Sequence, residues 1–458
     1  MSDFRASALH YAQDHRDRFL AEFKDFVSIA SISTDLQCKP EIEKTAEWVA
    51  GQLRGLGLAG VEIYSTKGHP VVYGESLLAG LKAPTVLVYG HYDVQPPEPL
   101  ELWQSSPFTP ELRGENLYAR GAADMKGQVL ASIKALEAVI QTGTLPVNVK
   151  FLIEGEEEIG SPNLEKFIID HKDLLTCDFA LNPDTGMLAP GLPTITYALR
   201  GLAYFELRVY GPNHDLHSGI YGGVVHNPAQ ALCELIAGMH DAHGRVTLPG
   251  FYAKVRQLDA EEREELARLP TDEKFYLEQT GTLALWGEVG YSPTERVGAR
   301  PTLEVNGLYS GFTGEGAKTV LPAWAMAKIS TRLVPDQDPD EVYQQLNDYL
   351  KINAPETIRV ELLQLTGGPA SISDRTSKSV KAMEDAMNSV WGKRPLFRRE
   401  GGSVPVVTLF KNILGAESVN CGFSLPDDNL HAPNEKQHLP TWYKGIDTLI
   451  HFYLNLGG

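Results

Sequence analysis

Short apolar runs of strand length alternate with a helical pattern in the first part of the chain. The runs TVLVYG at 85–90, VKFLI at 149–153 and FALN at 179–182 are typical of buried strands. Between the first two runs, apolar side chains recur at helical spacing, namely Val129, Ile133, Leu136 and Ile140. A strand, a helix and a further strand in this order predict a parallel sheet flanked by helices.

The pattern changes near Arg200 and changes back near Gly367. Between these points, the segments YFELRVYG, TLEVNGLYS, AMAKISTRLV and TIRVELLQL alternate apolar and polar positions, as half-exposed antiparallel strands do. Residues 254–297 are charged and irregular, which predicts a solvated helix and loop. We therefore predict an α/β fold with a mostly parallel sheet, formed by residues 1–197 and 367–458, and an inserted α+β domain at 198–366.

The length, charge and composition of the chain exclude several classes of protein. The 458 residues are enough for two domains of roughly 100 to 200 residues each. The 59 acidic and 41 basic residues give a net charge of -18, which repels phosphate backbones and anionic lipids. No apolar run approaches about 18 residues, and the N-terminal segment lacks the apolar stretch of a signal peptide. We expect a cytoplasmic protein without nucleic-acid or membrane partners, whose four widely spaced cysteines are small buried residues.

Polar residues follow each of the predicted buried strands. His91 comes after the first strand, the acidic run EGEEEIGS begins at Glu154 after the second, and Asp184 follows the third. Because the carboxyl ends of parallel strands meet at one edge of a sheet, these side chains are expected to converge. Asp124 stands where the helix between the first two strands begins, and His431 precedes the last helical segment, so both can reach that edge.

Each of these residues has an ordinary structural interpretation when it is taken alone. A single histidine is more often hydrogen-bonded than a metal ligand, and an aspartate at a helix start is usually a cap. Their joint placement favours a site with nitrogen and oxygen ligands, suited to zinc, manganese or cobalt. Two cations about 3.5–4 Å apart would offset the repulsion among the carboxylates and could activate water. Asp93, two residues after His91, could orient the histidine ring.

The motifs HYDVQP, ARGAADMKG, EGEEEIGS, DLHSGIYGG, GAKTVLP, RLVP, REGGSVPV and NLHAPNE occur in this order. Together with the Asp184 segment, they resemble those of the co-catalytic zinc metallopeptidases related to carnosine dipeptidase and cytosolic nonspecific dipeptidase. The wider family includes aminoacylases, a succinyl-diaminopimelate desuccinylase and glutamate carboxypeptidases. The resemblance extends over about residues 85 to 435.

This resemblance implies a role for each matching residue. Asp124 would bridge two metal ions, His91 and Asp184 would complete one site, and Glu158 and His431 would complete the other. Glu157 would be the general base for a water that bridges the metals, supported by Asp93. A shift of one residue within the run of glutamates would exchange these roles, and no role follows for Glu154 or Glu156.

The resemblance also implies that the inserted domain is a lid, and that this domain joins two subunits into a homodimer. His217 would reach the active site of the partner subunit and stabilise the oxyanion. Arg332 would bind the substrate carboxylate, because a planar guanidinium suits that task. Further substrate contacts would come from Thr319, Gly402 and Ser403.

The predicted function is metal-dependent hydrolysis of short peptides, most simply dipeptides, with two divalent metal ions in each subunit. Zinc is the first expectation, and manganese and cobalt are alternatives. A deacylase of N-acyl amino acids from the same family is the alternative enzyme. A metal-binding scaffold without turnover is the alternative from another class.

Overall fold

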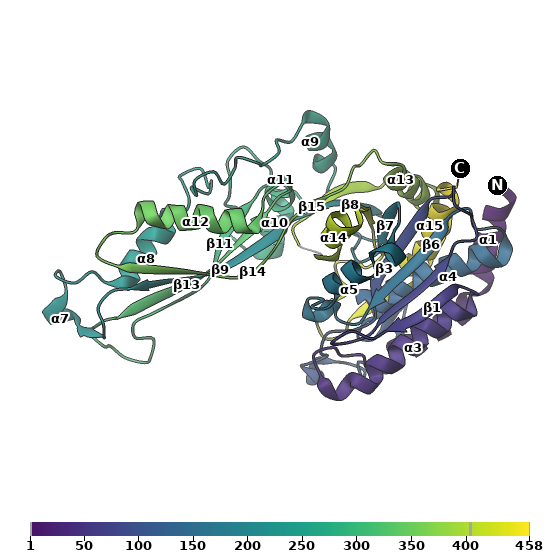
Figure 1. Ribbon diagram of the computed structural model, residues 1–458, viewed down its shortest axis with the longest axis horizontal. Helices are drawn as coiled ribbons and strands as arrows, with labels where there is room; N and C mark the ends of the chain where they lie inside the picture. Colours follow the sequence, from purple (N-terminus) through teal and green to yellow (C-terminus); the bar gives the residue numbers. More distant parts are fainter. Residues whose placement is uncertain (1, 403–404, 458) are drawn as a thin grey trace. The chain divides into compact units, whose positions relative to one another are not determined.

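The computed structural model describes residues 2–402 and 405–457, which form two compact units. The first unit comprises the chain up to Tyr197, Ser373–Phe397 and the residues from Val406 onward. The second unit comprises Ala198–Ile372 and the short segment that begins at Arg398. The α/β class predicted from the sequence is confirmed, since helices flank a large sheet whose central strands are parallel (Figure 1).

The large sheet of the first unit has the strand order β1-β2-β6-β3-β7-β17-β8. The central pairs β6–β3, β3–β7 and β7–β17 are parallel, whereas the outer pairs β1–β2, β2–β6 and β17–β8 are antiparallel. The strands are β1 (Ala59–Tyr64), β2 (Val71–Ser76), β3 (Thr85–His91), β6 (Asn148–Glu154), β7 (Phe179–Asn182), β8 (Thr194–Leu199) and β17 (Glu417–Asn420). The carboxyl ends of the four parallel strands therefore share one edge of the sheet.

Helices cover this sheet because they carry continuous apolar surfaces. Helix α4 (Gly127–Thr142) packs against β3 and is buried along almost its whole length. Helix α15 (Leu439–Asn455) packs against α4, and α3 (Lys39–Gly55) packs against β1 and β2. The remaining long helices of this unit are α1 (Ser2–Asp14), α2 (Arg16–Val27) and α13 (Lys378–Trp391).

A small sheet of β4 (Glu111–Arg113), β5 (Asn116–Tyr118) and β18 (Lys436–His438) completes the first unit. Its strands pair antiparallel, so that β18 joins the C-terminal part of the chain to the segment just before α4. Shorter elements are α5 (Leu164–Asp170), α6 (Lys172–Leu175), α14 (Pro405–Leu409) and β16 (Leu396–Glu400).

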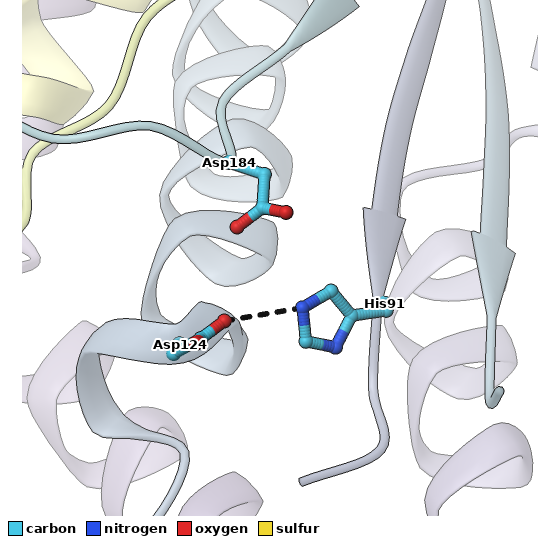
Figure 2. Close-up of side chains that lie close together, drawn as sticks. All are labelled: His91, Asp124 and Asp184. Carbon is cyan, nitrogen blue, oxygen red and sulfur yellow. Dashed lines mark hydrogen bonds and ion pairs between the residues drawn. The ribbon is translucent and has the colours of Figure 1, made fainter. Parts of the chain in front are cut away.

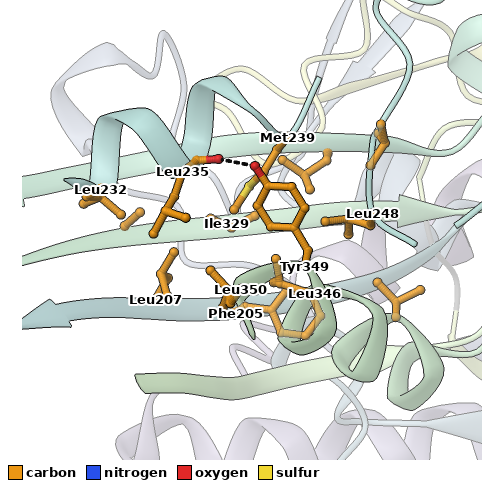
Figure 3. Packing of buried hydrophobic residues seen from close by; sticks show 14 of the residues in the cluster. Phe205, Leu207, Leu232, Leu235, Met239, Leu248, Ile329, Leu346, Tyr349 and Leu350 are labelled. Atoms are coloured by element: carbon orange, nitrogen blue, oxygen red, sulfur yellow. Dashed lines mark hydrogen bonds between the residues drawn. The ribbon is translucent and has the colours of Figure 1, made fainter. Parts of the chain in front are cut away.

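The second unit is built on a four-stranded antiparallel sheet with the order β11-β13-β9-β14. Its strands are β9 (Gly201–Tyr210), β11 (Thr302–Ser310), β13 (Trp324–Leu333) and β14 (Arg359–Gly368). One face of the sheet packs on α8 (Pro228–Ala237) and α12 (Pro339–Asn353) through Phe205, Leu232, Ile329 and Leu346 (Figure 3). The strands β10 (Leu216–His217) and β12 (Val320–Leu321) and the helix α7 (Ser218–Tyr221) form a smaller substructure.

Two sequence expectations need correction. Residues 254–297 contain three short helices, α9 (Ala260–Ala267), α10 (Glu273–Thr280) and α11 (Pro293–Ala299), instead of one helix and a loop. The cysteines are free as expected, but Cys421 is the buried one, Cys233 is exposed, and Cys38 and Cys177 are intermediate. In the part of the chain that the structure describes, none of the helices is both long and apolar enough to cross a bilayer.

Candidate metal centre

The shared edge of the parallel strands carries most of the predicted ligands. His91 is the last residue of β3 and pairs in register with Glu154, the last residue of β6. Glu157 and Glu158 lie in the turn that follows β6, and Asp184 lies two residues beyond the end of β7. The parallel pairing of these strands therefore delivers side chains from three separate segments to one place.

Two groups of ligand atoms form around Asp124. One group contains His91, Asp124 and Asp184, and within it all the ligand atoms lie within 4.8 Å of one another (Figure 2). The second group contains Asp124, Glu158 and His431, under the same distance limit. Asp124 Oδ1 accepts a hydrogen bond from His91 Nε2 at 3.2 Å, and Asp124 Oδ2 accepts one from His431 Nε2 at 2.9 Å. The carboxylate of Asp124 thus presents one oxygen to each group.

The four glutamates of the acidic run point toward different partners. Glu158 Oε2 lies 3.2 Å from His431 Nε2 and accepts a hydrogen bond from Gln95 Nε2 at 2.8 Å. Glu154 Oε1 accepts hydrogen bonds from the hydroxyls of Tyr89 and Ser161 at 2.7 and 2.8 Å.

The side chain of Glu156 binds residues outside the two ligand groups. Its Oε1 accepts a hydrogen bond from the backbone N–H of His69 at 2.9 Å, and both its oxygens accept from Asn163 Nδ2. At Gly68, an added Cβ would come within 1.7 Å of Glu156 Oε1, so only glycine allows this close approach. The third consecutive glutamate therefore anchors the turn, while Glu158 is the one that joins the second ligand group.

Asp93 is fully buried and connects the two neighbouring segments of the site. Its carboxylate oxygens accept the backbone N–H groups of Glu157 and Glu158 at 3.2 and 3.1 Å. The ring of His91 donates from Nδ1 to the backbone carbonyl of Asp93 at 3.1 Å, which leaves Nε2 directed at Asp124. Asp93 therefore fixes both the histidine ring and the turn that carries the glutamates.

Sequence reasoning missed Glu435, which holds the Asp124 loop in place. Its carboxylate is completely buried and accepts hydrogen bonds from Arg120 Nη1 at 2.7 Å and from the backbone N–H groups of Gly121, Ala123 and Asp124. The NLHAPNE motif contains this residue, but nothing in the motif indicates that its side chain returns to the loop before α4. The hydrogen bond from Gln95 to Glu158 was missed for the same reason.

His431 lies in a turn that is fixed by local contacts. Its φ of 60° is in the left-handed region, which is unusual for a residue other than glycine and is a feature of functional sites. Asn434 anchors the turn, because its Nδ2 donates to the carbonyl of Leu102 at 2.7 Å and its Oδ1 accepts from the N–H of Gln104 at 2.9 Å. The exposed His431 ring is thus held against Asp124 by its backbone.

Burial and the charges of neighbouring side chains shift the pKa values of acidic and histidine side chains in the site. Burial raises the pKa of the Glu157 carboxyl to about 7, with Glu158 adding to the effect and His91 opposing it. Burial and then the charge of Asp124 raise the pKa of Asp184 well above its usual range. Hydrogen bonds to Asp124 and Glu158 raise the pKa of His431 to about 10. In the absence of cations, bound protons therefore offset much of the negative charge.

The predicted substrate contacts belong to the second unit. His217 is exposed, caps α7 by accepting the N–H of Gly219 on Nδ1 at 3.0 Å, and stands in register opposite Val320. Thr319 accepts the N–H of Ser218 on its carbonyl oxygen at 3.0 Å, so it lies close to His217. Arg332 is on β13 and lines a cavity, and Gly402 is exposed. Ser403 lies outside the described residues.

The fold and the grouped ligands define a metallopeptidase type of site, and the chain belongs to the peptidase family M20/M25/M40, whose model matches residues 87–455. This assignment confirms the family resemblance seen in the motifs. The family is one of peptidases, so the protein is classed as an enzyme.

Individual relatives cover nearly the whole chain. The Cys-Gly metallodipeptidase DUG1 of Candida albicans is 30% identical, over 96% of this chain and 96% of its own. The Beta-Ala-His dipeptidase of Mus musculus is 31% identical, over 98% of this chain and 94% of its own. Among solved structures, the M20 family metallo-carboxypeptidase Sso-CP2 from Sulfolobus solfataricus is 34% identical, with a TM-score of 0.82 over 96% of this chain and 99% of its own.

Proposed function

We propose that this protein hydrolyses dipeptides with the help of two divalent metal ions bound around Asp124. The observation that carries the proposal is the sharing of Asp124 by two ligand groups, each of which contains one histidine and a second carboxylate. Two relatives, a Cys-Gly metallodipeptidase and a Beta-Ala-His dipeptidase, support dipeptides as the substrate class.

The residues fit divalent cations on chemical grounds. Imidazole nitrogens and carboxylate oxygens are ligands that zinc, manganese and cobalt accept, and no thiol belongs to either group. The raised pKa of buried Asp184 is also what a carboxyl has when its positive counterpart is missing. In this proposal His91, Asp124 and Asp184 hold one ion, and Asp124, Glu158 and His431 hold the other. Zinc is our first choice of metal.

Two metal ions held by these residues would polarise the peptide carbonyl and lower the pKa of a bound water. Glu157 accepts a proton from the attacking water and then donates it to the leaving amine. Burial raises the pKa of this carboxyl above its usual range, which favours a group that accepts a proton and returns it. Asp93 keeps this carboxyl in place through the N–H of Glu157 and orients His91.

Residues of the second unit supply substrate binding in this proposal. The guanidinium of Arg332 binds the free carboxylate of the peptide, which sets the distance between the C-terminus and the cleaved bond. His217, from the partner subunit of a homodimer, donates to the developing oxyanion. Thr319, Gly402 and Ser403 make further contacts with the substrate.

The substitution Glu157→Gln tests the proposed base. We expect dipeptide hydrolysis to fall by about 10²- to 10⁴-fold, because an amide cannot accept the proton of the water. Metal content, measured by elemental analysis, stays unchanged because Glu157 belongs to neither ligand group. Glu165→Gln, on the exposed side of α5, is the matched control. Full activity of Glu157→Gln with both metals bound would show that another group is the base.

A carboxypeptidase acting on longer peptides is the second candidate, because the solved structure with 34% identity is named a metallo-carboxypeptidase. Rates on a dipeptide, on a pentapeptide with the same C-terminal pair and on an N-acyl amino acid separate the possibilities. The dipeptide proposal requires the first rate to be the highest. A preference for the pentapeptide selects the carboxypeptidase, and a preference for the acyl compound selects the deacylase. The panel is run with zinc, manganese and cobalt in turn.

Mixing two inactive variants tests whether His217 acts across a homodimer. A mixed dimer of Glu157→Gln and His217→Ala contains one site with an intact Glu157 and an intact His217 only if the histidine is supplied by the other subunit. We therefore expect subunit exchange to restore activity, up to about one quarter of the wild-type rate for random pairing. If mixing restores no activity, or if the active protein has a monomeric mass, His217 does not act from the partner. The cytoplasmic location stays a prediction from the sequence.

A further inference from the structure

The second unit contains a cavity of about 420 Å³ whose lining is rich in arginine. Its floor is the face of β11 and β13 that lies opposite the apolar core. Thr302 pairs with Arg332 and Glu304 pairs with Ser330 across the two strands, and directly paired residues project on the same face of a sheet. Leu303, between Thr302 and Glu304, and Ile329, next to Ser330, belong to the apolar core instead. Because successive side chains of a strand project on opposite faces of the sheet, the polar side chains of β11 and β13 line the cavity.

Arginines also form the walls of the cavity. Arg200 precedes β9, Arg296 lies on α11 and Arg300 follows it, so that with Arg332 four guanidinium groups line one space. The lining contains two glutamates, Glu288 and Glu304. Four positive and two negative side chains leave an excess of positive charge, in a protein whose net charge is -18. Such a local excess attracts anions.

The carboxylate of Glu288 is already paired with two arginines. Its carboxylate accepts two hydrogen bonds from Arg300, at 2.7 and 2.8 Å, and one from Arg245 at 3.0 Å. Arg296 donates from Nε to the carbonyl oxygen of Glu288 at 2.9 Å, and it forms no ion pair with any residue that the structure describes. Its positive charge is therefore available to a ligand in the cavity.

Arg200 and Arg332 lie close enough to repel each other. Burial, and next the charge of Arg332, lower the pKa of Arg200 to about 10, and Glu400 and Glu304 oppose this shift. An anion between the two guanidiniums would reduce the repulsion. The exposed indole of Trp286, which packs edge-on against His240 at 5.2 Å between ring centres, adds an apolar wall suited to methylene groups.

We propose that this arginine cavity binds the acidic side chain of a peptide substrate whose C-terminal residue is glutamate or aspartate. The inference rests on the proposed function, in which Arg332 binds the main-chain carboxylate. A side chain that leaves the same residue then meets Arg296 and Arg200 in the cavity. The protein is accordingly selective for substrates that carry two carboxylates at the C-terminal end.

The test compares Ala-Glu with Ala-Gln, which has the same shape and lacks the charge. We expect kcat/KM of the wild type to favour Ala-Glu by about tenfold or more, the effect of one charge-assisted hydrogen bond. Arg296→Gln brings this ratio close to one, with the larger loss of rate on Ala-Glu, and Arg296→Lys restores part of the preference. Arg263→Gln, which removes an arginine that pairs with Glu295 outside the cavity, leaves the ratio unchanged.

A second variant and a binding measurement keep the inference independent of folding and of hydrolysis. Glu304→Gln removes a negative charge from the floor and raises the preference for Ala-Glu. Calorimetry of the metal-loaded protein with glutarate measures anion binding directly, and Arg296→Gln weakens this binding.

The outcomes separate the two proposals. If no peptide is cleaved but glutarate binding depends on Arg296, the proposed function is wrong and the cavity is still an anion site. Equal rates on Ala-Glu and Ala-Gln with unaltered glutarate binding in Arg296→Gln would overturn the cavity proposal. Inorganic phosphate that displaces glutarate from the cavity with equal affinity would also overturn it, because the site would then bind free anions generally.

Discussion

Two sets of carboxylates in the first unit have different surroundings, because the anchored set is buried and the ligand set is half-buried. The anchored carboxylates, Glu154, Glu156 and Glu435, receive their hydrogen bonds from hydroxyl, amide, guanidinium and backbone donors. The ligand carboxylates are Asp124, Glu158 and Asp184, and they face imidazole rings and one another.

The difference shows how a protein separates structure from chemistry with a single residue type. A carboxylate that accepts hydrogen bonds from N–H and O–H groups has partners that do not depend on a cation. A carboxylate that shares its surroundings with other carboxylates and imidazoles needs a cation or a proton. Glu156 and Glu158 are only two residues apart, yet Glu156 belongs to the anchored carboxylates and Glu158 to the ligand carboxylates.

Removal of the shared ligand is the most severe test of the comparison. In Asp124→Asn both ligand groups lose their common carboxylate, so we expect metal content to fall for both ions and hydrolysis to drop by at least about a thousandfold. Elemental analysis after gel filtration and a dipeptide assay measure the two effects. Asp170→Asn, at the exposed end of α5, serves as the control. Retention of one metal with partial activity would contradict equal dependence on Asp124.

Removal of an anchored carboxylate should act on the metals indirectly. In Glu435→Gln an NH₂ group faces the backbone N–H donors, and buried Arg120 loses its charged partner. We expect metal affinity to fall by about 10- to 100-fold because Asp124 is no longer fixed. Competition with a chelating dye measures the affinity, and exposed Glu47→Gln is the control. Unchanged affinity with lower thermal stability would make Glu435 purely structural.

The smallest effect is expected at Glu154, and it depends on pH. Burial, and then Asp93, raise its pKa from 4.5 to about 8, so the folded protein holds this proton more tightly than the unfolded chain. The wild type therefore loses stability as pH rises through this window. Glu154→Gln keeps an oxygen for Tyr89 and Ser161 and does not titrate, so its advantage should grow from pH 5 to 8, to a few kcal/mol at most.

Urea unfolding of the metal-free protein at pH 5, 7 and 9 measures this effect. Glu165→Gln should show the same stability difference from wild type at all three pH values. An advantage of Glu154→Gln that does not change with pH would mean that the buried carboxyl is not the titrating group. Such a result would move Glu154 out of the anchored set.

The site residues that could be predicted from the sequence were those that lie in local sequence patterns. Apolar strands with His91, Glu157 and Asp184 just beyond them predict convergence, because parallel strands end at one edge. Asp124, at a helix start, and His431, before the last helical segment, were also predicted to reach that edge, and their separate roles as ligands came from the family motifs. Glu435 was unpredictable, because its donors at 120–124 precede it by more than 300 positions. The capping box Ser292–Glu295 that begins α11 was also not predicted, although its Ser-x-x-Glu spacing is a signal for a helix start.

The route of the chain through the metal centre has a consequence for biosynthesis. The first candidate ligand is His91, the last is His431, and Glu435, which fixes the Asp124 loop, follows four residues later. A ribosome must therefore add more than 300 residues after Asp124 before either the second ligand group or the support of the shared aspartate exists. Translation that stops before residue 431 releases a chain that carries the acidic run but lacks His431, so under the proposed function it could not assemble the second ligand group.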